Sequence, residues 1–166
     1  MNRRLNPSCF FLGLLCVLIA IWFDQFTKLI ITDLVMRPPR TIYVTSFLNM
    51  VLGFNNGVGF GLFSEVLKGR PGILIIASSG LVAGLLLWMA MAKDYRESAG
   101  LGLMAGGAAG NTFDRIQRGR VTDFIDFHLA DWHWPTFNFA DVAIVVGTFI
   151  LVSGLLLRPD AADKAR

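Results

Sequence analysis

Five aspartates gather between Gly110 and Asp141, in a chain that is otherwise mostly apolar. They are Asp114, Asp123, Asp126, Asp131 and Asp141. A carboxyl group at the edge of a membrane is costly and marks a candidate functional site. Two carboxyls that share a poorly hydrated site cannot both ionise easily, so one of them keeps a proton. The ionised member can activate water while the protonated member polarises a carbonyl, which is the chemistry of aspartyl peptide hydrolysis.

Asp141 has the most informative position among these acids. The segment 142–157 that follows it contains no charged residue, so Asp141 is expected at a membrane boundary. Asn138 precedes it by one helical turn and can hydrogen-bond it or a substrate. Asp123 and Asp126 both lie in the sequence VTDFIDF, and either one can be its partner. The alternation of apolar and acidic residues in this sequence predicts a short amphipathic segment that returns to the membrane surface. The spacing suits an ion or proton relay equally well, or structural caps that pair with Arg115, Arg118 and Arg120.

Other reactive side chains do not form a recognisable site. His128 and His133 are five residues apart, which does not place them on one helical face as metal ligands. Their neighbours Trp132 and Trp134 indicate a membrane-interface belt instead. Cys9 and Cys16 share a helical face and are interpreted as apolar packing residues, not as a disulfide or metal site.

Composition places the chain among membrane proteins. It has 166 residues, of which 54% are hydrophobic and 16% are charged, and its mean hydropathy is +0.58. Soluble domains carry about 25% charged residues. The basic residues are scattered, so nothing indicates nucleic-acid binding. We therefore predict a mainly α, polytopic membrane protein that forms a single membrane domain over residues 1–166.

Apolar runs predict four transmembrane helices. They cover about residues 9–31, 72–92, 99–113 and 137–157. Asp24 and Lys28 lie near the far end of the first at the favourable i,i+4 spacing, and we interpret them as a structural ion pair. Glycines at 102, 106 and 110 repeat every four residues in the third, which predicts close helix packing.

The segments between the helices predict a small β-rich platform outside the membrane. Residues 41–51 within the segment 34–71 are rich in β-branched and aromatic residues, as in one or two short strands. Residues 114–136 are expected to form a second loop on the same side. Basic residues number seven on that side and seven on the side of the termini, so their count leaves the orientation undecided.

Five short motifs, in order, resemble those of lipoprotein signal peptidase (signal peptidase II). They are Asp24-Gln25-Phe26-Thr27-Lys28, Asn55-Asn56-Gly57-Val58-Gly59-Phe60, Gly110-Asn111-Thr112-Phe113-Asp114-Arg115, Val121-Thr122-Asp123-Phe124 and Phe137-Asn138-Phe139-Ala140-Asp141. The resemblance extends over most of the chain, and the predicted four-helix layout agrees with it. One departure is Gly59, where the family more often has alanine.

The resemblance implies a catalytic dyad of Asp123 and Asp141, and it selects Asp123 over Asp126. It also implies a set of substrate-binding or site-supporting residues. These are Asn55, Gly57, Asn111, Asp114, Arg115, Asn138, Asp24 and Lys28. Because two aspartates suffice to activate water, no metal or other cofactor is expected.

The resemblance further implies an endopeptidase that removes the signal peptide from diacylglyceryl-modified prolipoproteins, cutting before the lipidated cysteine. Its expected partners are that substrate and membrane lipid, and the chain is expected to act as a monomer. It implies a multi-pass protein of the bacterial cytoplasmic (inner) membrane, with cytoplasmic termini and a periplasmic site. A small ion or metabolite carrier and a non-catalytic scaffold are the alternatives from the residues alone. A presenilin-like protease would need a G-x-G-D motif, which this sequence lacks.

Overall fold

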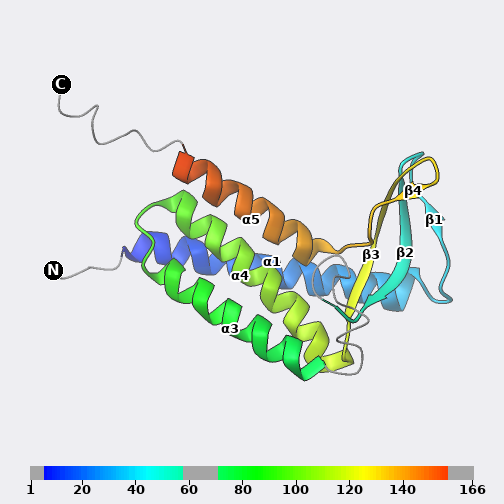
Figure 1. Cartoon of the computed structure of the whole chain (residues 1–166), viewed down its shortest axis with the longest axis horizontal. Coiled ribbons are helices and arrows are strands. Elements are labelled where there is room, and N and C mark those ends of the chain that lie inside the picture. Colours follow the sequence, from blue (N-terminus) through cyan, green and yellow to red (C-terminus); the bar gives the residue numbers. More distant parts are fainter. Residues whose placement is uncertain (1–5, 58–70, 157–166) are drawn as a thin grey trace.

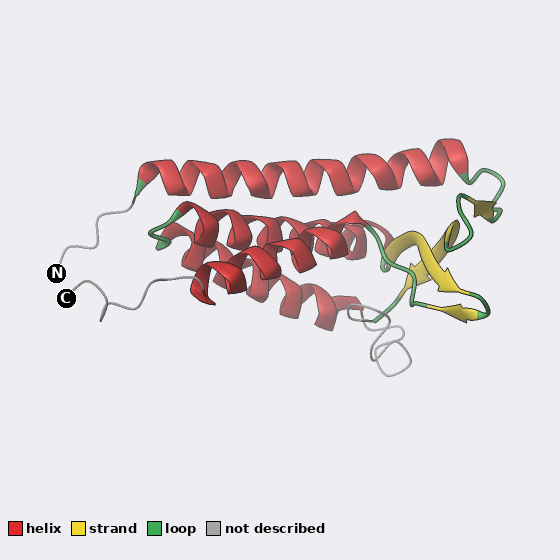
Figure 2. Ribbon diagram, turned by 90° about the horizontal axis from the view of Figure 1, so that it is seen from above, coloured by secondary structure: helices red, strands yellow, loops and turns green. Residues whose placement is uncertain are grey.

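A computed structural model describes residues 6–57 and 71–156. These residues form long helices side by side, with an antiparallel sheet beyond one end of the bundle (Figure 1). Figure 2, turned by a quarter, shows the same separation of bundle and sheet. A mainly helical fold with a small sheet, as predicted, is thus confirmed for the described chain. Val58, Gly59 and Phe60, the last three residues of the second motif, lie outside the described residues.

The described helices coincide with the apolar runs, with shifts of a few residues at their ends. Their bounds are α1 Pro7–Ile30, α3 Pro71–Ala90, α4 Tyr95–Arg118 and α5 Phe139–Leu156, and α1 continues as a π-helix, η1, over Ile31–Val35. Helix α4 begins earlier than predicted because Asp94 caps it, accepting a 2.8 Å hydrogen bond from the Glu97 backbone N–H. It ends at Gly119, whose φ of 72° is the left-handed conformation of a helix C-cap.

Within the described chain, two helical segments are long and apolar enough to cross a membrane on their own. They are Pro7–Val35, with 29 residues, and Pro71–Ala90, with 20 residues. Helix α5 contributes a shorter apolar stretch, Phe139–Gly154. Helix α4 is not comparable in hydropathy because it begins and ends with charged residues and is rich in glycine.

Helix α4 packs against α1, α3 and α5 and is the centre of the bundle (Figure 1). The glycines predicted to allow close packing face α1. A Cβ atom at Gly106 would lie 2.7 Å from both the Val17 carbonyl oxygen and the Ala20 Cβ, and one at Gly102 would collide with the Gly13 carbonyl oxygen. At Gly110 it would lie 2.6 Å from the Asp24 carboxylate. In lipid, such small residues let backbones approach and gain van der Waals contact.

The sheet has the order β1-β2-β3-β4, with every described pair antiparallel. The strands are β1 Ile42–Tyr43, β2 Leu48–Asn55, β3 Val121–Leu129 and β4 Trp132–His133. Two segments far apart in the sequence therefore share one sheet, since β2 pairs with β3. A small core that includes Ile31, Met36 and Phe124 joins the end of α1 to the sheet.

The prediction that residues 114–136 form a loop was wrong. Residues 114–118 continue α4, and the alternating sequence VTDFIDF belongs to strand β3. We interpreted its alternation as an amphipathic segment lying on the membrane. The same period of two is that of a strand, and β2 supplies the hydrogen-bonding partner that a strand needs.

Replacement of Gly106 by alanine is expected to destabilise the bundle by about 1–3 kcal/mol, because the added methyl group overpacks the contact with α1. The matched control is Gly84→Ala in α3, where a Cβ would meet no atom within 4 Å. That change should be neutral or slightly stabilising, since alanine favours helices by up to about 1 kcal/mol. Thermal unfolding in detergent measures both, and equal transition temperatures for the two variants would contradict close packing at Gly106.

Candidate active site

Asp123 and Asp141 come from different elements that a short return of the chain brings together. Asp123 lies near the start of β3, and Asp141 lies in the first turn of α5. After β4 the chain runs back along β3, where Phe137 and Ile125 exchange backbone hydrogen bonds of 2.9 Å and 3.1 Å. This bridge places the first turn of α5 beside the start of β3.

Asn138 connects the two carboxyls. Its Nδ2 donates to Asp123 Oδ1 at 2.6 Å. Its Oδ1 accepts a hydrogen bond from the Asp141 backbone N–H at 3.1 Å, and its own backbone N–H donates to Asp141 Oδ2 at 3.2 Å. This reciprocal pair is a capping box at the start of α5. The same fully buried asparagine therefore begins the helix and contacts both acids.

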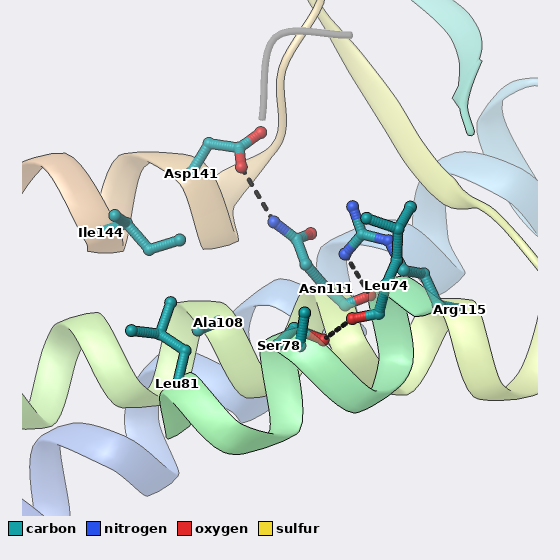
Figure 3. Close-up of a pocket in the computed structure, with 9 residues that line it drawn as sticks. Leu74, Ser78, Leu81, Ala108, Asn111, Arg115, Asp141 and Ile144 are labelled. Carbon is teal, nitrogen blue, oxygen red and sulfur yellow. Dashed lines mark hydrogen bonds between the residues drawn. The ribbon is translucent and has the colours of Figure 1, made fainter. Parts of the chain in front are cut away.

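Asn111, on α4, binds the other carboxylate oxygen of Asp141. Its Nδ2 donates to Asp141 Oδ1 at 2.9 Å (Figure 3). Its Oδ1 accepts hydrogen bonds from Lys28 Nζ and from Asn138 Nδ2, each at 3.1 Å. Asn111 thereby links α1, α4 and α5 at the site.

Lys28 lies in a fully buried ionic cluster behind the site. Its Nζ is 2.8 Å from Asp24 Oδ2 and 3.0 Å from Asp114 Oδ2. The other Asp24 oxygen accepts a 3.0 Å hydrogen bond from the Ala140 backbone N–H, and Asp114 Oδ2 accepts one of the same length from the Thr122 backbone N–H. Each acid of the cluster thus holds the residue that immediately precedes Asp141 or Asp123.

Two further side chains complete this cluster. Arg118 Nη1 lies 3.0 Å from Asp114 Oδ1. Gln25 Nε2 donates to Asp24 Oδ2 at 2.9 Å and to Asp114 Oδ1 at 3.3 Å. Gln25 was not predicted as a site-supporting residue. Its position inside the Asp24–Lys28 motif was a signal for such a role. The sequence could not show that Gln25 also contacts Asp114, because Asp114 lies on another helix.

Asp123 has an unusual protonation equilibrium. Its pKa is raised to about 7, first by burial and then by the neighbouring charge of Asp141. The hydrogen bond from Asn138, the charge of Lys28 and the hydrogen bond from Asn55 act in the opposite direction without cancelling the increase. A carboxyl with this pKa exchanges a proton near neutral pH, as a general acid or base must.

Asp126, the other partner that the sequence left open, lies in a different environment. Its carboxylate accepts a 3.0 Å hydrogen bond from Asn49 Nδ2 and lies 2.8 Å from His133 Nδ1. Burial alone would raise the pKa of Asp126, but the hydrogen bonds from His133 and Asn49 outweigh it and hold the pKa below its ordinary value. Asp126 is thus engaged by β2 and β4, away from the Asn138 network.

The predicted substrate-side residues also gather here. Arg115, on α4, donates from Nη2 to the Gly57 carbonyl oxygen at 2.7 Å and from Nη1 to the Asn111 carbonyl oxygen at 3.2 Å. Asn55 Oδ1 accepts a 2.7 Å hydrogen bond from the Gly57 backbone N–H. These contacts anchor the end of β2 and the turn after it against α4.

An apolar groove of about 240 Å³ leads along the bundle to Asp141. Helices α3, α4 and α5 form its walls, as Figure 3 shows. It is lined by Leu74, Ala77, Ser78, Leu81, Ala108, Asn111, Arg115, Asp141 and Ile144. An apolar group can therefore lie between the helices with its polar end at Asp141.

His128 and His133 face each other across the pair of strands β3 and β4. His128 and His133 stack with their ring centroids 5.1 Å apart, and His133 contacts Asp126. Among residues 6–57 and 71–156, no three His, Cys, Asp or Glu side chains converge as they would around a metal ion.

The raised pKa of Asp123 predicts a pH-dependent effect of Asp123→Asn on stability. In the unfolded chain this group titrates near pH 4. Its contribution to folded stability is therefore fully present below that pH and is lost as the pH rises through about 7. Asparagine never ionises. The free energy of unfolding of Asp123→Asn should therefore rise relative to that of the wild type between pH 4 and 8, by on the order of a few kcal/mol.

Thermal unfolding across this pH range measures the difference. The exposed Asp131→Asn is the matched control, which should follow the wild type at every pH. Parallel curves for wild type and Asp123→Asn would show that Asp123 titrates normally.

Comparison with known proteins gives a consistent answer. The family model described as signal peptidase (SPase) II matches residues 16–157. The lipoprotein signal peptidase of Pelagibacter ubique is 39% identical over 154 residues, covering 90% of this chain and 90% of that protein. The corresponding protein of Solibacter usitatus is 40% identical over 136 residues, covering 80% of this chain and 83% of its own.

Two solved structures agree with these relatives. Both are bacterial membrane enzymes, with TM-scores of 0.75 and 0.72 and sequence identities of 29% and 30%. The first match covers 87% of each chain, and the second covers 89% of this chain and 94% of the other. The match of the family model to most of the chain, the similar sequences and the shared fold lead to one conclusion: this chain belongs to the signal peptidase II family.

Proposed function

We propose that this protein is an aspartyl endopeptidase that removes the signal peptide from diacylglyceryl-modified prolipoproteins, cutting before the lipidated cysteine. The observation that carries the proposal is the pair Asp123 and Asp141, which are hydrogen-bonded to the same buried asparagine, with Asp141 lining an apolar groove. Relatives named lipoprotein signal peptidase support the substrate class.

The chemistry needs one proton on the pair. The ionised carboxyl takes a proton from water as the water oxygen attacks the scissile carbonyl carbon, and the protonated carboxyl gives its proton to the carbonyl oxygen. The resulting tetrahedral diol then loses the amine. The nitrogen receives the proton that came from water, and a hydroxyl proton of the diol returns to the pair. Peptide and water become acid and amine, and the enzyme recovers its single proton.

The groove suits a substrate that is tethered to lipid. A diacylglyceryl group keeps the substrate in the bilayer, so its cleavage site must arrive from the side, between helices. Leu74, Leu81 and Ile144 offer apolar contact along the groove, and Asn111 and Arg115 offer polar contact at its end. We assign Asn55, Gly57 and Arg115 to the binding of substrate backbone at that end. Asp24, Lys28, Asp114 and Asn138 support the dyad.

The same proposal includes the arrangement in the membrane. Helices α1, α3, α4 and α5 each cross the bilayer, and the chain forms one membrane domain over residues 1–166. The sheet and the acids face the periplasm of a bacterial cytoplasmic membrane, with both termini in the cytoplasm. The protein acts as a monomer, without metal or cofactor.

The carrier alternative is not supported. A carrier would need polar groups along the depth of its helices. In the described chain, the buried charged side chains gather instead at the end of the bundle that meets the sheet; they are Asp24, Lys28, Asp114, Arg115, Asp123 and Asp126. The family relationship also points to a peptidase.

Cleavage of a diacylglyceryl-modified prolipoprotein by purified protein in detergent tests the activity. Asp123→Asn and Asp141→Asn should each lower kcat by at least about 100-fold, the contribution of a positioned proton donor or acceptor. Asp126→Asn is the matched control on the same strand and should stay active. Normal cleavage by either dyad variant would remove that residue from the mechanism. No cleavage by folded wild type would reject the proposed function.

Labelling of single cysteines by a membrane-impermeant maleimide tests the topology in intact cells whose outer membrane has been permeabilised. In a background without Cys9 and Cys16, Asp131→Cys, in the turn between β3 and β4, should be labelled. Lys93→Cys, between α3 and α4, should be labelled only after the cells are lysed. The reverse pattern would place the sheet in the cytoplasm.

A further inference from the structure

The two acids of the pair differ in the donors that face them. Asp141 presents Oδ1 to Asn111 Nδ2 at 2.9 Å and Oδ2 to the Asn138 backbone N–H at 3.2 Å. A backbone N–H can only donate, and so can the nitrogen end of an amide. Both oxygens of Asp141 therefore meet donors, an arrangement that stabilises an ionised carboxylate.

The orientation of the Asn111 amide is set by Lys28. An ammonium group has three donors and no acceptor. Lys28 directs two of these toward Asp24 and Asp114 and one toward Asn111 Oδ1. If the amide were reversed, its NH₂ group would face the ammonium and its oxygen would face Asp141. Both contacts would be repulsive, so Lys28 obliges Asn111 to offer N–H to Asp141.

Asp123 has weaker support for a negative charge. Asn138 Nδ2, its close donor at 2.6 Å, also lies within 3.3 Å of the Thr122 carbonyl oxygen and 3.1 Å of Asn111 Oδ1. Two hydrogens thus serve three acceptors. Asn55 supplies a further hydrogen bond. The pKa of about 7 for Asp123 agrees with a carboxyl that is often protonated at neutral pH.

The cations of the surrounding helices also act on the two acids. Lys28 on α1 and Arg115 on α4 both act on Asp123 and Asp141. Lys28 therefore does not distinguish the acids by its charge alone, whereas Arg115 interacts more strongly with Asp141 than with Asp123. The Lys28 charge is moreover shared with Asp24 and Asp114. The directed hydrogen bonds and the charge of Arg115 thus both favour the ionised form at Asp141.

We propose that Lys28, acting through Asn111, keeps Asp141 ionised and leaves the proton of the pair on Asp123. This inference rests on the proposed function and assigns its roles. Asp141 takes the proton from the attacking water, and Asp123 gives its proton to the carbonyl oxygen. When the diol breaks down, Asp141 returns the water-derived proton to the leaving nitrogen and Asp123 recovers one from the diol. Lys28 is a positioning residue, since its hydrogen bonds reach Asp141 only through Asn111.

Nuclear magnetic resonance of protein labelled with carbon-13 at the aspartate carboxyls locates the proton directly. The signals are assigned with Asp123→Asn and Asp141→Asn. In the wild type, the Asp123 signal should follow protonation with a midpoint near pH 7, while the Asp141 signal stays that of a carboxylate from about pH 6 to 8. Protonation of Asp141 with Asp123 ionised would overturn the assignment.

Variants of the positioning residue test the cause. The ratio of proton occupancy on Asp123 to that on Asp141 should fall about tenfold in Lys28→Met. This is the effect of losing one hydrogen bond to a charged group. The exposed Lys93→Met removes the same charge at the far end of the bundle and should change nothing. Asn111→Leu removes the side chain that connects Lys28 to Asp141 but leaves Lys28 with its two carboxylates. It should give the same shift, even if Lys28→Met does not fold. An unchanged ratio in Asn111→Leu would overturn the proposal that Asn111 transmits the effect of Lys28 to Asp141.

These measurements are independent of turnover. A wild type with its proton on Asp123 that cleaves no prolipoprotein would reject the proposed function alone. An active wild type with its proton on Asp141 would reject the role assignment alone.

Discussion

The architecture of the site depends on one buried ammonium group placed between two carboxylates. Lys28 binds Asp24 and Asp114, and each of these acids accepts a hydrogen bond from the backbone N–H just before a member of the pair. Buried ion pairs add little to net stability because their desolvation offsets the attraction. Their effect here is geometric. They bring together the start of α5, the start of β3 and the ends of α1 and α4.

This cluster requires the helices to lie close together, and the glycines of α4 permit it. At Gly110 the Asp24 carboxylate occupies the space that a Cβ would take. On the neighbouring face of α4, a Cβ at Gly107 would collide with the Ala140 carbonyl oxygen, one residue from Asp141. The glycines of α4 thus serve both packing and the site, since a bulkier residue at Gly107 or Gly110 would separate groups that must hydrogen-bond.

Local patterns in the sequence predicted the local features of the fold. The uncharged run that forms α3 and the β-branched residues of β1 and β2 identified their elements, because hydropathy and periodicity are properties of neighbouring residues. The position of Asp141 at the start of an apolar helix was evident for the same reason.

Contacts between distant segments could not be read in this way. Asp24 and Lys28 were predicted as a simple ion pair, although Asp24 also caps a helix that begins 115 residues later in the chain. The choice between Asp123 and Asp126 depended on the resemblance. On a strand, residues three apart point to opposite faces, but only the bridge between Ile125 and Phe137 decides which face meets α5.

The capping box of α5 has a consequence for how the enzyme can change. Active-site residues are commonly a burden on stability, so that their loss makes a protein more robust. Asp141, a member of the proposed dyad, is an exception, because its carboxylate also completes the first turn of its own helix. Its side chain is held in place before any substrate arrives, and little reorganisation is left for the binding step. A lineage that abandoned catalysis would still have reason to keep an acid at this position, so an aspartate here is not by itself a record of activity.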